Sequence, residues 1–453
     1  MSFFTKHKDV LLISLTTLLY ITSAYFLERV EFGQLLFLWF GLFGSFYLLL
    51  KSKTISTSTL IGLVVLFRLV FLLAIPNLSQ DFYRFIWDGR MLLEGHNPYL
   101  SLPETIIQKG TQLISEQYTL YKGMGAMNGS HYTNYPPINQ LCFLIAALFG
   151  SKTIFGSVLI LRTIIILADI GVLYFGTKLL KRLNLPVKNI FWYALNPFII
   201  IEMTGNLHFE PVMLFFLIWS LYKLHQQKWT LAALLFACSI SVKLIPLLFL
   251  PLFYQWFVCN KSLQISKKHG FLKLIGFYTI ILITTILLFL PFYSSKFAEN
   301  YASSVSLWFR NFEFNASFYY LFREIGYLFS EWNQIAIIGK ITPIMTIVFL
   351  IIVTFFRNNK SMIQMITALL FGICFYYFTA STVHPWYLAT PLVLSIFTKY
   401  RFPIIWTVTI IFSYQAYTNT PWQENLGFVA LEYSVVYGFM IFEIHKNFKI
   451  LRA

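Results

Sequence analysis

Residues 34–53 read QLLFLWFGLFGSFYLLLKSK, an apolar run of helical length that ends in a basic connection. A hydrocarbon core of roughly 30 Å requires about 20 such residues from a helix that crosses it. Similar runs recur along the chain, which is 58% hydrophobic and 11% charged, whereas soluble proteins carry roughly 25% charged residues. Because backbone polar groups cannot stay unpaired in lipid, the runs predict an all-α, polytopic membrane protein.

Hydropathy predicts about fourteen transmembrane helices in one integral membrane domain, 1–453. Their expected bounds are 9–27, 34–50, 57–76, 155–178, 188–203, 211–224, 229–242, 245–259, 271–291, 336–356, 361–380, 386–398, 402–418 and 428–446. Much of the formal charge of +16 lies in alternate short connections such as 51–53, 178–188 and 357–360. Connections rich in Lys and Arg usually stay in the cytoplasm. We therefore expect a multi-pass protein of the cell (inner or plasma) membrane with both termini in the cytoplasm. The same placement argues against nucleic acid as a partner.

Two connections, 77–154 and 292–335, are too long to be simple links, and the charge pattern places both outside the cytoplasm. The stretch PPINQLCFLIAALFG at 136–150 is short and begins with two prolines, so we expect an interfacial helix there. The sequence contains no Walker loop and no GxGxxG motif after a strand. The sequence therefore gives no indication of a mechanism that uses a nucleotide-sugar or ATP.

The first loop contains SQDFYRFIWDGRMLLEGHNPY at 79–99. If this stretch is helical, Asp81, Arg84 and Asp88 share one face, and we expect Arg84 and Asp88 to bind substrate. Asp81 would then lie at the start of a helix at the membrane boundary, where an ionised carboxylate can accept a proton from a hydroxyl. The same pattern also fits an interfacial helix with an ordinary Asp–Arg pair, and both interpretations stay open.

The stretch EMTGNLHFEP at 202–211 brings His208 and Glu210 to a turn on the same predicted face. Such residues at membrane depth are usually functional, and we expect them to position a sugar or a lipid phosphate. Two candidate ligands are too few to indicate a metal site. Lys243 interrupts the apolar stretch ACSISVKLIPLLFLP, and its ammonium either snorkels to the interface or binds a phosphate.

Two further clusters lie on the same predicted face. His384 and Tyr387, in STVHPWY at 381–387, either contact a sugar or phosphate or belong to an aromatic belt at the interface. Arg310, in the second loop, is a candidate phosphate ligand. All five clusters map to one side of a topology that was derived without them, which favours a single extracytoplasmic site.

At these residues the chain resembles the GT-C superfamily of integral membrane glycosyltransferases, and in particular bacterial enzymes that use polyprenyl-phosphate-mannose. The resemblance covers roughly 60–400. It rests on the order and spacing of the 79–99 stretch, YPPINQ (135–140), LNPFIIIEMTGNLHFEPVML (195–214), SVKLIPLL (241–248) and HPWYL (384–388).

The resemblance implies a polyprenyl-phosphate-sugar donor, inverting transfer and an acidic general base in the first loop, which is Asp81. Glu210 takes the position of a second acidic motif that is more often Asp, which leaves its role less defined. His384 matches a histidine near the active site of related enzymes. The number of spans before the Asp81 loop departs from many relatives, so helix numbering is not transferred.

We therefore expect a glycosyltransferase that moves a hexose, mannose by resemblance, to a glycan, glycolipid or protein hydroxyl. Two alternatives stay open: a polymerase or ligase of lipid-linked oligosaccharides, and a polytopic lipid or sugar transporter. Transporters place polar residues near the bilayer midplane in repeated halves, and the sequence shows no repeat. We expect no cofactor; dependence on a divalent metal is not indicated by any motif.

Overall fold

The computed structural model describes residues 2–260, 266–310, 312–419 and 422–452. Over these residues the chain is helical and forms no named strand, and Phe314 and Thr382 make an isolated bridge. The α-helices are α1 (Ser2–Tyr25), α2 (Phe32–Lys51), α3 (Thr57–Val70), α4 (Asp81–Leu93), α5 (Pro103–Gln108), α6 (Gln117–Gly129), α7 (Pro137–Phe149), α8 (Ile154–Arg182), α9 (Phe191–Ala194), α10 (Glu210–His225), α11 (Trp229–Ile240), α12 (Tyr254–Val258), α13 (Lys267–Phe289), α14 (Phe297–Arg310), α15 (Phe318–Tyr327), α16 (Ile335–Phe356), α17 (Met362–Thr379), α18 (Ala389–Ser395), α19 (Phe402–Thr409) and α20 (Leu426–Arg452). Tighter or wider helical segments are η1 (Pro98–Leu100), η2 (Val187–Ile190), the π-helix η3 (Ile199–Gly205), η4 (Ile245–Phe253), η6 (Leu290–Phe292), η7 (Pro385–Leu388) and η8 (Ile410–Thr418).

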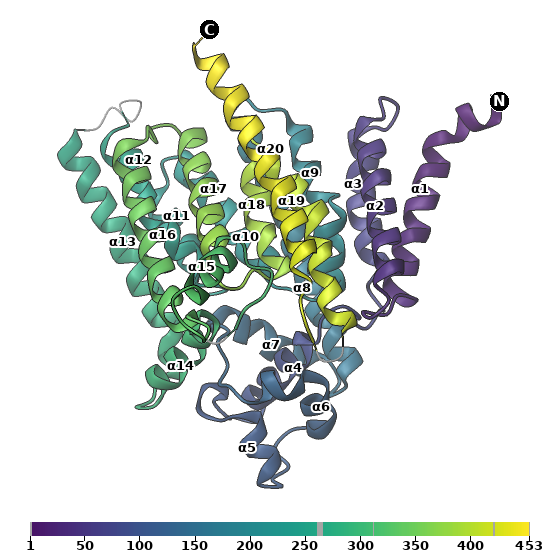
Figure 1. The fold of residues 1–453 in the computed structure, drawn as a ribbon, viewed down its shortest axis with the longest axis vertical. Coiled ribbons are helices and arrows are strands. Elements are labelled where there is room, and N and C mark those ends of the chain that lie inside the picture. Colours follow the sequence, from purple (N-terminus) through teal and green to yellow (C-terminus); the bar gives the residue numbers. More distant parts are fainter. Residues whose placement is uncertain (1, 261–265, 311, 420–421, 453) are drawn as a thin grey trace.

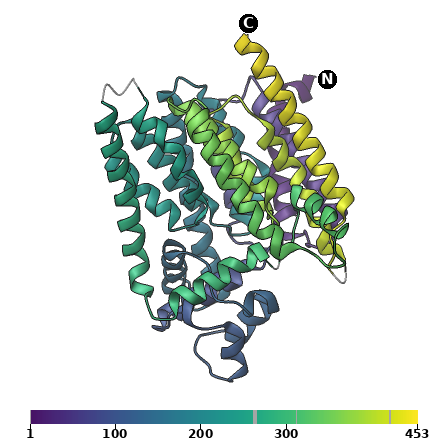
Figure 2. The same ribbon diagram turned by 60° about the vertical axis from the view of Figure 1, so that its left-hand side comes forward.

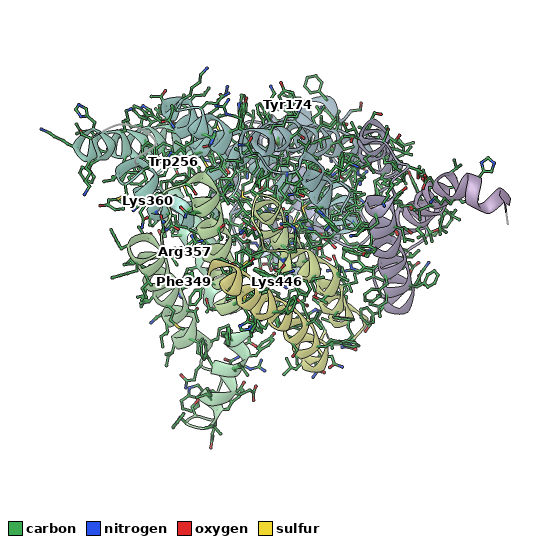
Figure 3. The ribbon with its side chains drawn as sticks, turned by 90° about the horizontal axis from the view of Figure 1, so that it is seen from above. Tyr174, Trp256, Phe349, Arg357, Lys360 and Lys446 are labelled. Atoms are coloured by element: carbon green, nitrogen blue, oxygen red, sulfur yellow. The ribbon has the colours of Figure 1, made fainter. Side chains whose placement is uncertain are left out.

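The long helices run side by side, and the helices of the first loop lie at one end of them. Both termini lie at the opposite end, and α4 to α7 gather at the end away from them (Figure 1). The basic connection after α16, with Arg357 and Lys360, lies at the terminal end, as does Lys446 near the C-terminus (Figures 1 and 3). The basic connections and the first loop thus occupy opposite ends, in the relative order that the charge pattern predicts. Which membrane face each end meets stays a prediction.

Among the described residues, six helices are long and apolar enough to cross a membrane, namely α2, α8, α13 extended through η6, α16, α17 and the 426–447 part of α20. A seventh arises if η3 and α10, which meet at 112°, form one bent span. The predicted number of about fourteen is not confirmed. Several predicted spans are broken into short helices, for instance 245–259 into η4 and α12, because Pro246 and Pro251 cannot donate backbone hydrogen bonds.

The break between η3 and α10 is held open by a buried arginine of α8. Arg162 Nε and Nη2 donate to the carbonyl oxygens of Thr204 and Gly205, each at 2.9 Å. Arg162 Nη1 donates to the carbonyls of Leu72, at 3.1 Å, and Ala74, just after α3. Carbonyl groups at helix ends lack hydrogen-bond donors within the helix, and here the guanidinium of Arg162 supplies these donors. This arrangement leaves residues 206–209 free to turn into the interior.

The two long loops contact each other. Asn97 Nδ2 donates to the carbonyl of Phe292 at 3.0 Å, and Asn300 Nδ2 donates to the carbonyl of Tyr99 at 3.0 Å. Helix α14, which follows Phe292, runs across the ends of the long helices rather than along them (Figure 2). These contacts join α14 to the first loop and bring both loops to one end of the molecule.

Helix α4 packs closely on α7, the helix expected at the interface over 136–150. The rings of Phe85 and Phe143 stack with centroids 4.8 Å apart. A Cβ atom at Gly89 would lie 2.1 Å from the carbonyl oxygen of Phe143. The close approach requires glycine, so the position of α4, and of Asp81 at its start, depends on Gly89.

Replacing Gly89 with alanine is therefore expected to destabilise the protein by about 1–3 kcal/mol, because a methyl group overpacks the contact between α4 and α7. Helix propensity alone would favour alanine by about 1 kcal/mol. Gly62→Ala is the matched control, since nothing lies within 4 Å of a Cβ built on Gly62 of α3. Thermal unfolding in detergent tests the pair, and equal midpoints for Gly89→Ala and wild type would contradict the packing argument.

Candidate active site

A cavity of about 890 Å³ lies beside the N-terminus of α4, where the breaks before α10 and η4 meet the loop after α17. Five residues that the sequence predicted for the site line this cavity: Asp81, His208, Lys243, His384 and Tyr387. They come from four separate segments. The cavity therefore brings together clusters that the sequence could assign only to the same side of the membrane, from the predicted topology.

Asp81 is the first residue of α4, and it is partly exposed in the cavity. Asn128 Nδ2 donates a long hydrogen bond of 3.4 Å to Asp81 Oδ1. Burial raises the pKa of Asp81, whereas this hydrogen bond and the charges of Arg29 and Lys243 act to lower it. A carboxylate with a raised pKa and few donors accepts a proton more readily than a solvated one, which suits a general base.

Lys243 lies in the break between α11 and η4, close to the turn that the sequence predicts. Its ammonium forms an ion pair with Glu210, and it also lies 5.5 Å from the centroid of the Tyr387 ring. The side chain of Lys243 is 20% exposed and that of Glu210 only 2% exposed. Lys243 therefore faces the cavity while Glu210 lies behind it.

Glu210 was expected to contact a sugar, but it is not part of the cavity lining. Its contact with Lys243 instead makes it a positioning residue for the ammonium. The same contact disfavours a metal at His208 and Glu210, because the ammonium already neutralises the carboxylate. Within the described ranges, no group of three or more His, Cys, Asp or Glu residues could hold a metal ion.

A stack of three rings forms one wall of the cavity. Trp386 lies between His208, at a centroid distance of 3.8 Å, and His384, at 4.5 Å, and the interplanar angles are 18° and 6°. The ring of Tyr387 meets His384 edge-on at 5.5 Å. Burial, together with the charges of Lys243 and Arg29, lowers the pKa of His384 to about 3. His384 is therefore neutral at physiological pH.

The second loop holds this wall in place. The backbone N–H of Phe314 donates to the carbonyl of Ser381 at 3.1 Å, and the N–H of Val383 donates to the carbonyl of Phe314 at 2.8 Å. The Phe314 ring lies 5.2 Å from His384. Arg310, the other residue predicted from this loop, ends α14, and its side chain lies outside the described residues.

Arg84 and Asp88 do not line the cavity, although the sequence suggested that they bind substrate. Both side chains are buried, with Arg84 Nε 2.9 Å from Asp88 Oδ1. Arg84 Nη1 also donates to the carbonyls of Asn128, at 2.6 Å, and His131, at 3.0 Å. The pair holds the turn that carries Asn128 and His131 into the cavity lining.

Several lining residues were not identified from the sequence. Arg29 is the one basic residue of FLERVEFG (26–33), around the first predicted outer connection. A lone basic residue in an outer connection was the signal that could have identified Arg29 as a site residue. Burial, with the charge of Arg84, lowers the pKa of His131 to about 4, so His131 is neutral at physiological pH. The others carry no sequence motif. They include Asn128, Tyr417 and Trp422, whereas Asn139 belongs to the YPPINQ stretch (135–140) but was not singled out as a site residue.

Another part of the cavity lining is apolar and includes residues that are exposed at the molecular surface. It consists of Leu244, Ile245, Leu247, Leu248, Pro343 and Ile347, from η4 with the residue before it and from α16. Leu247 is 43% exposed and Ile347 is 55% exposed, so this side continues onto the apolar exterior of the helices. Lys243 directly precedes Leu244, which places a cation at the start of the apolar side.

The fold and the cavity define a polytopic membrane protein with a cavity that combines a carboxylate, cations and an apolar side reaching the exterior. Residues 7–259 match the model of the MptA/B family, described as alpha-(1->6)-mannopyranosyltransferase, N-terminal domain. The match covers more than half of the chain, so the chain belongs to this family of mannosyltransferases. Among curated proteins, none matches the chain significantly. Family membership supports an enzyme that carries out mannosyl transfer.

Proposed function

We propose that the protein transfers mannose from polyprenyl-phosphate-mannose to an acceptor hydroxyl outside the cytoplasm, with Asp81 as general base. The observation that carries the proposal is the single cavity that joins Asp81, Lys243 and an apolar side open to the exterior. A lipid chain fits the apolar side, its phosphate lies beside Lys243, and the sugar then reaches Asp81. The donor, the acceptor class and the inverting mechanism are all parts of this proposal.

The reaction is a single displacement. The acceptor hydroxyl gives its proton to the Asp81 carboxylate as its oxygen bonds to the anomeric carbon. The bond from that carbon to the phosphate oxygen breaks, and polyprenyl phosphate leaves with the electron pair. Lys243 stabilises the charge that develops on the phosphate. One displacement inverts the anomeric centre, so an α-linked product requires a β-linked donor.

The neutral rings of the cavity suit the sugars. His208, Trp386 and His384 present a rigid wall, and imidazoles that carry no charge can accept or donate hydrogen bonds to hydroxyl groups. The family assignment favours a transferase over a transporter. A polymerase or ligase of lipid-linked oligosaccharides would share the phosphate site, and it would differ in the length of the transferred glycan.

Purified protein is expected to transfer labelled mannose from polyprenyl-phosphate-mannose, but not from a nucleotide-linked mannose, to an acceptor in a lipid extract. The reason is that the cavity has an apolar side for a lipid chain, and the sequence shows no nucleotide-binding motif. The measurement is label recovered in product lipid for each donor, with boiled protein as the control. Transfer from the nucleotide donor alone would contradict the proposal. If the protein transfers an oligosaccharide supplied on the same polyprenyl lipid but does not transfer mannose, the result would favour a polymerase or ligase.

A further inference from the structure

We propose that Arg29 is a second cation of the site, besides Lys243, and binds a phosphate oxyanion of a substrate. The inference rests on the proposed function, which it extends to the connection between α1 and α2. Arg29 belongs to that connection and lines the same cavity as Asp81 and Lys243.

Tyr417 presents the guanidinium of Arg29 to the cavity. The guanidinium carbon lies 3.3 Å from the centroid of the Tyr417 ring, and both residues line the cavity. A guanidinium stacked on an aromatic face keeps its in-plane N–H groups available, and these groups match two oxygens of a phosphate. Tyr417 lies at the end of η8, beyond the residues that match the family, so the C-terminal part of the chain completes this feature.

No carboxylate of the described residues lies within ion-pair distance of Arg29. In the described part of the chain Lys243 pairs with Glu210, whereas Arg29 forms no ion pair and its Nε is buried without a hydrogen-bond partner. A partly buried cation without a counterion is unfavourable, and an anionic ligand would supply one.

The charges of Arg29 and Lys243 affect the same two groups, Asp81 and His384. The charges of both cations lower the pKa of Asp81 and of His384, and all four residues line the same cavity. Among the described lining residues, Asp81 is the one carboxylate against these two cations. Because Lys243 is already paired with Glu210 behind the lining, Arg29 is the lining cation that forms no ion pair and can take a phosphate as its partner. That phosphate belongs either to the polyprenyl donor or to an anionic acceptor lipid.

Equilibrium binding in nanodiscs tests the inference without turnover, so its failure is distinct from failure of the proposed transfer. The ligands are polyprenyl phosphate and the polyprenol of equal length. Arg29→Gln is expected to weaken binding of the phosphate by about tenfold or more, since it removes a charged hydrogen bond, while binding of the alcohol is unchanged. Arg29→Lys should restore part of the loss, and Glu28→Gln, an exposed neighbour, should change neither ligand.

A second arm identifies the source of the phosphate. It compares a phosphate-bearing glycolipid acceptor with its neutral counterpart in the same binding assay. A loss confined to polyprenyl phosphate assigns Arg29 to the donor, and a loss confined to the phosphate-bearing acceptor assigns it to the acceptor. If Arg29→Gln keeps the wild-type unfolding midpoint and binds every phosphate ligand as tightly as wild type, the inference is overturned.

Discussion

Asp81→Asn is expected to lower the rate of mannosyl transfer by about 10²–10⁴-fold, the contribution typical of a positioned general base. The amide keeps the shape of the carboxylate and an oxygen that can accept from Asn128, but it cannot take the proton of the acceptor hydroxyl. The rate should fall with little change in donor binding, because the lost interaction is made in the transition state. The measurement is the initial rate of label transfer from polyprenyl-phosphate-mannose at saturating donor.

Glu94→Gln is the matched control, since Glu94 follows α4 and is exposed, so the same carboxyl-to-amide change there should leave the rate unaltered. The pH dependence supplies a second readout. The active form of Asp81 is the carboxylate, so activity is present above its pKa and is lost as pH falls through it. Burial raises that pKa above the usual 3.8, and the acid limb should lie correspondingly higher. Transfer by Asp81→Asn within tenfold of wild type would remove Asp81 from the mechanism.

Arg68→Leu is expected to destabilise the protein by about 3–5 kcal/mol, because it leaves Asp169 buried without its cation. Arg68 Nε lies 2.9 Å from Asp169 Oδ2, and both side chains are fully buried. Arg68 Nη1 also donates to the carbonyl of Ala194 at 2.8 Å, and Tyr193 Oη donates to Asp169 at 2.8 Å. The pair thus joins α3, α8 and α9 in the interior, where water cannot replace either partner.

The double variant Arg68→Leu/Asp169→Leu should recover part of the loss, since an apolar pair of similar size avoids the unpaired charge. Arg182→Leu, at the exposed end of α8, is the matched control and should change stability by no more than about 0.5 kcal/mol. Thermal unfolding of the detergent-solubilised protein, followed by tryptophan fluorescence, measures all four proteins. A double variant no more stable than Arg68→Leu would show that the unpaired Asp169 is not the cause.

The helical class and the position of Asp81 were predictable from local signals. Apolar runs without strand alternation indicate helices in lipid, and the 79–99 stretch, if helical, has Asp81 at the start of its helix. The structure has α4 at Asp81–Leu93. The number of spans was less predictable, because hydropathy does not distinguish a helix that crosses a bilayer from two short ones broken at a proline.

The sequence also predicted that Arg84 and Asp88 share a face with Asp81, as the spacing along a helix requires. It could not predict that their side chains pair in the interior while Asp81 faces the cavity, since that depends on α7 and the turn at 128–131 packing against α4.

By itself, the sequence determined the membrane class, the all-helical class and the polar clusters, because each depends on the order of residues within one segment. The tertiary structure alone decided which clusters meet. Glu210 lies behind Lys243, Trp386 stacks between His208 and His384, and Tyr417 carries Arg29 into the cavity. Apart from the contact between His384 and Trp386, these contacts join segments that are far apart in the chain, and no local periodicity encodes them. They arise from how the broken helices pack around the buried arginines, which is a property of the whole folded chain.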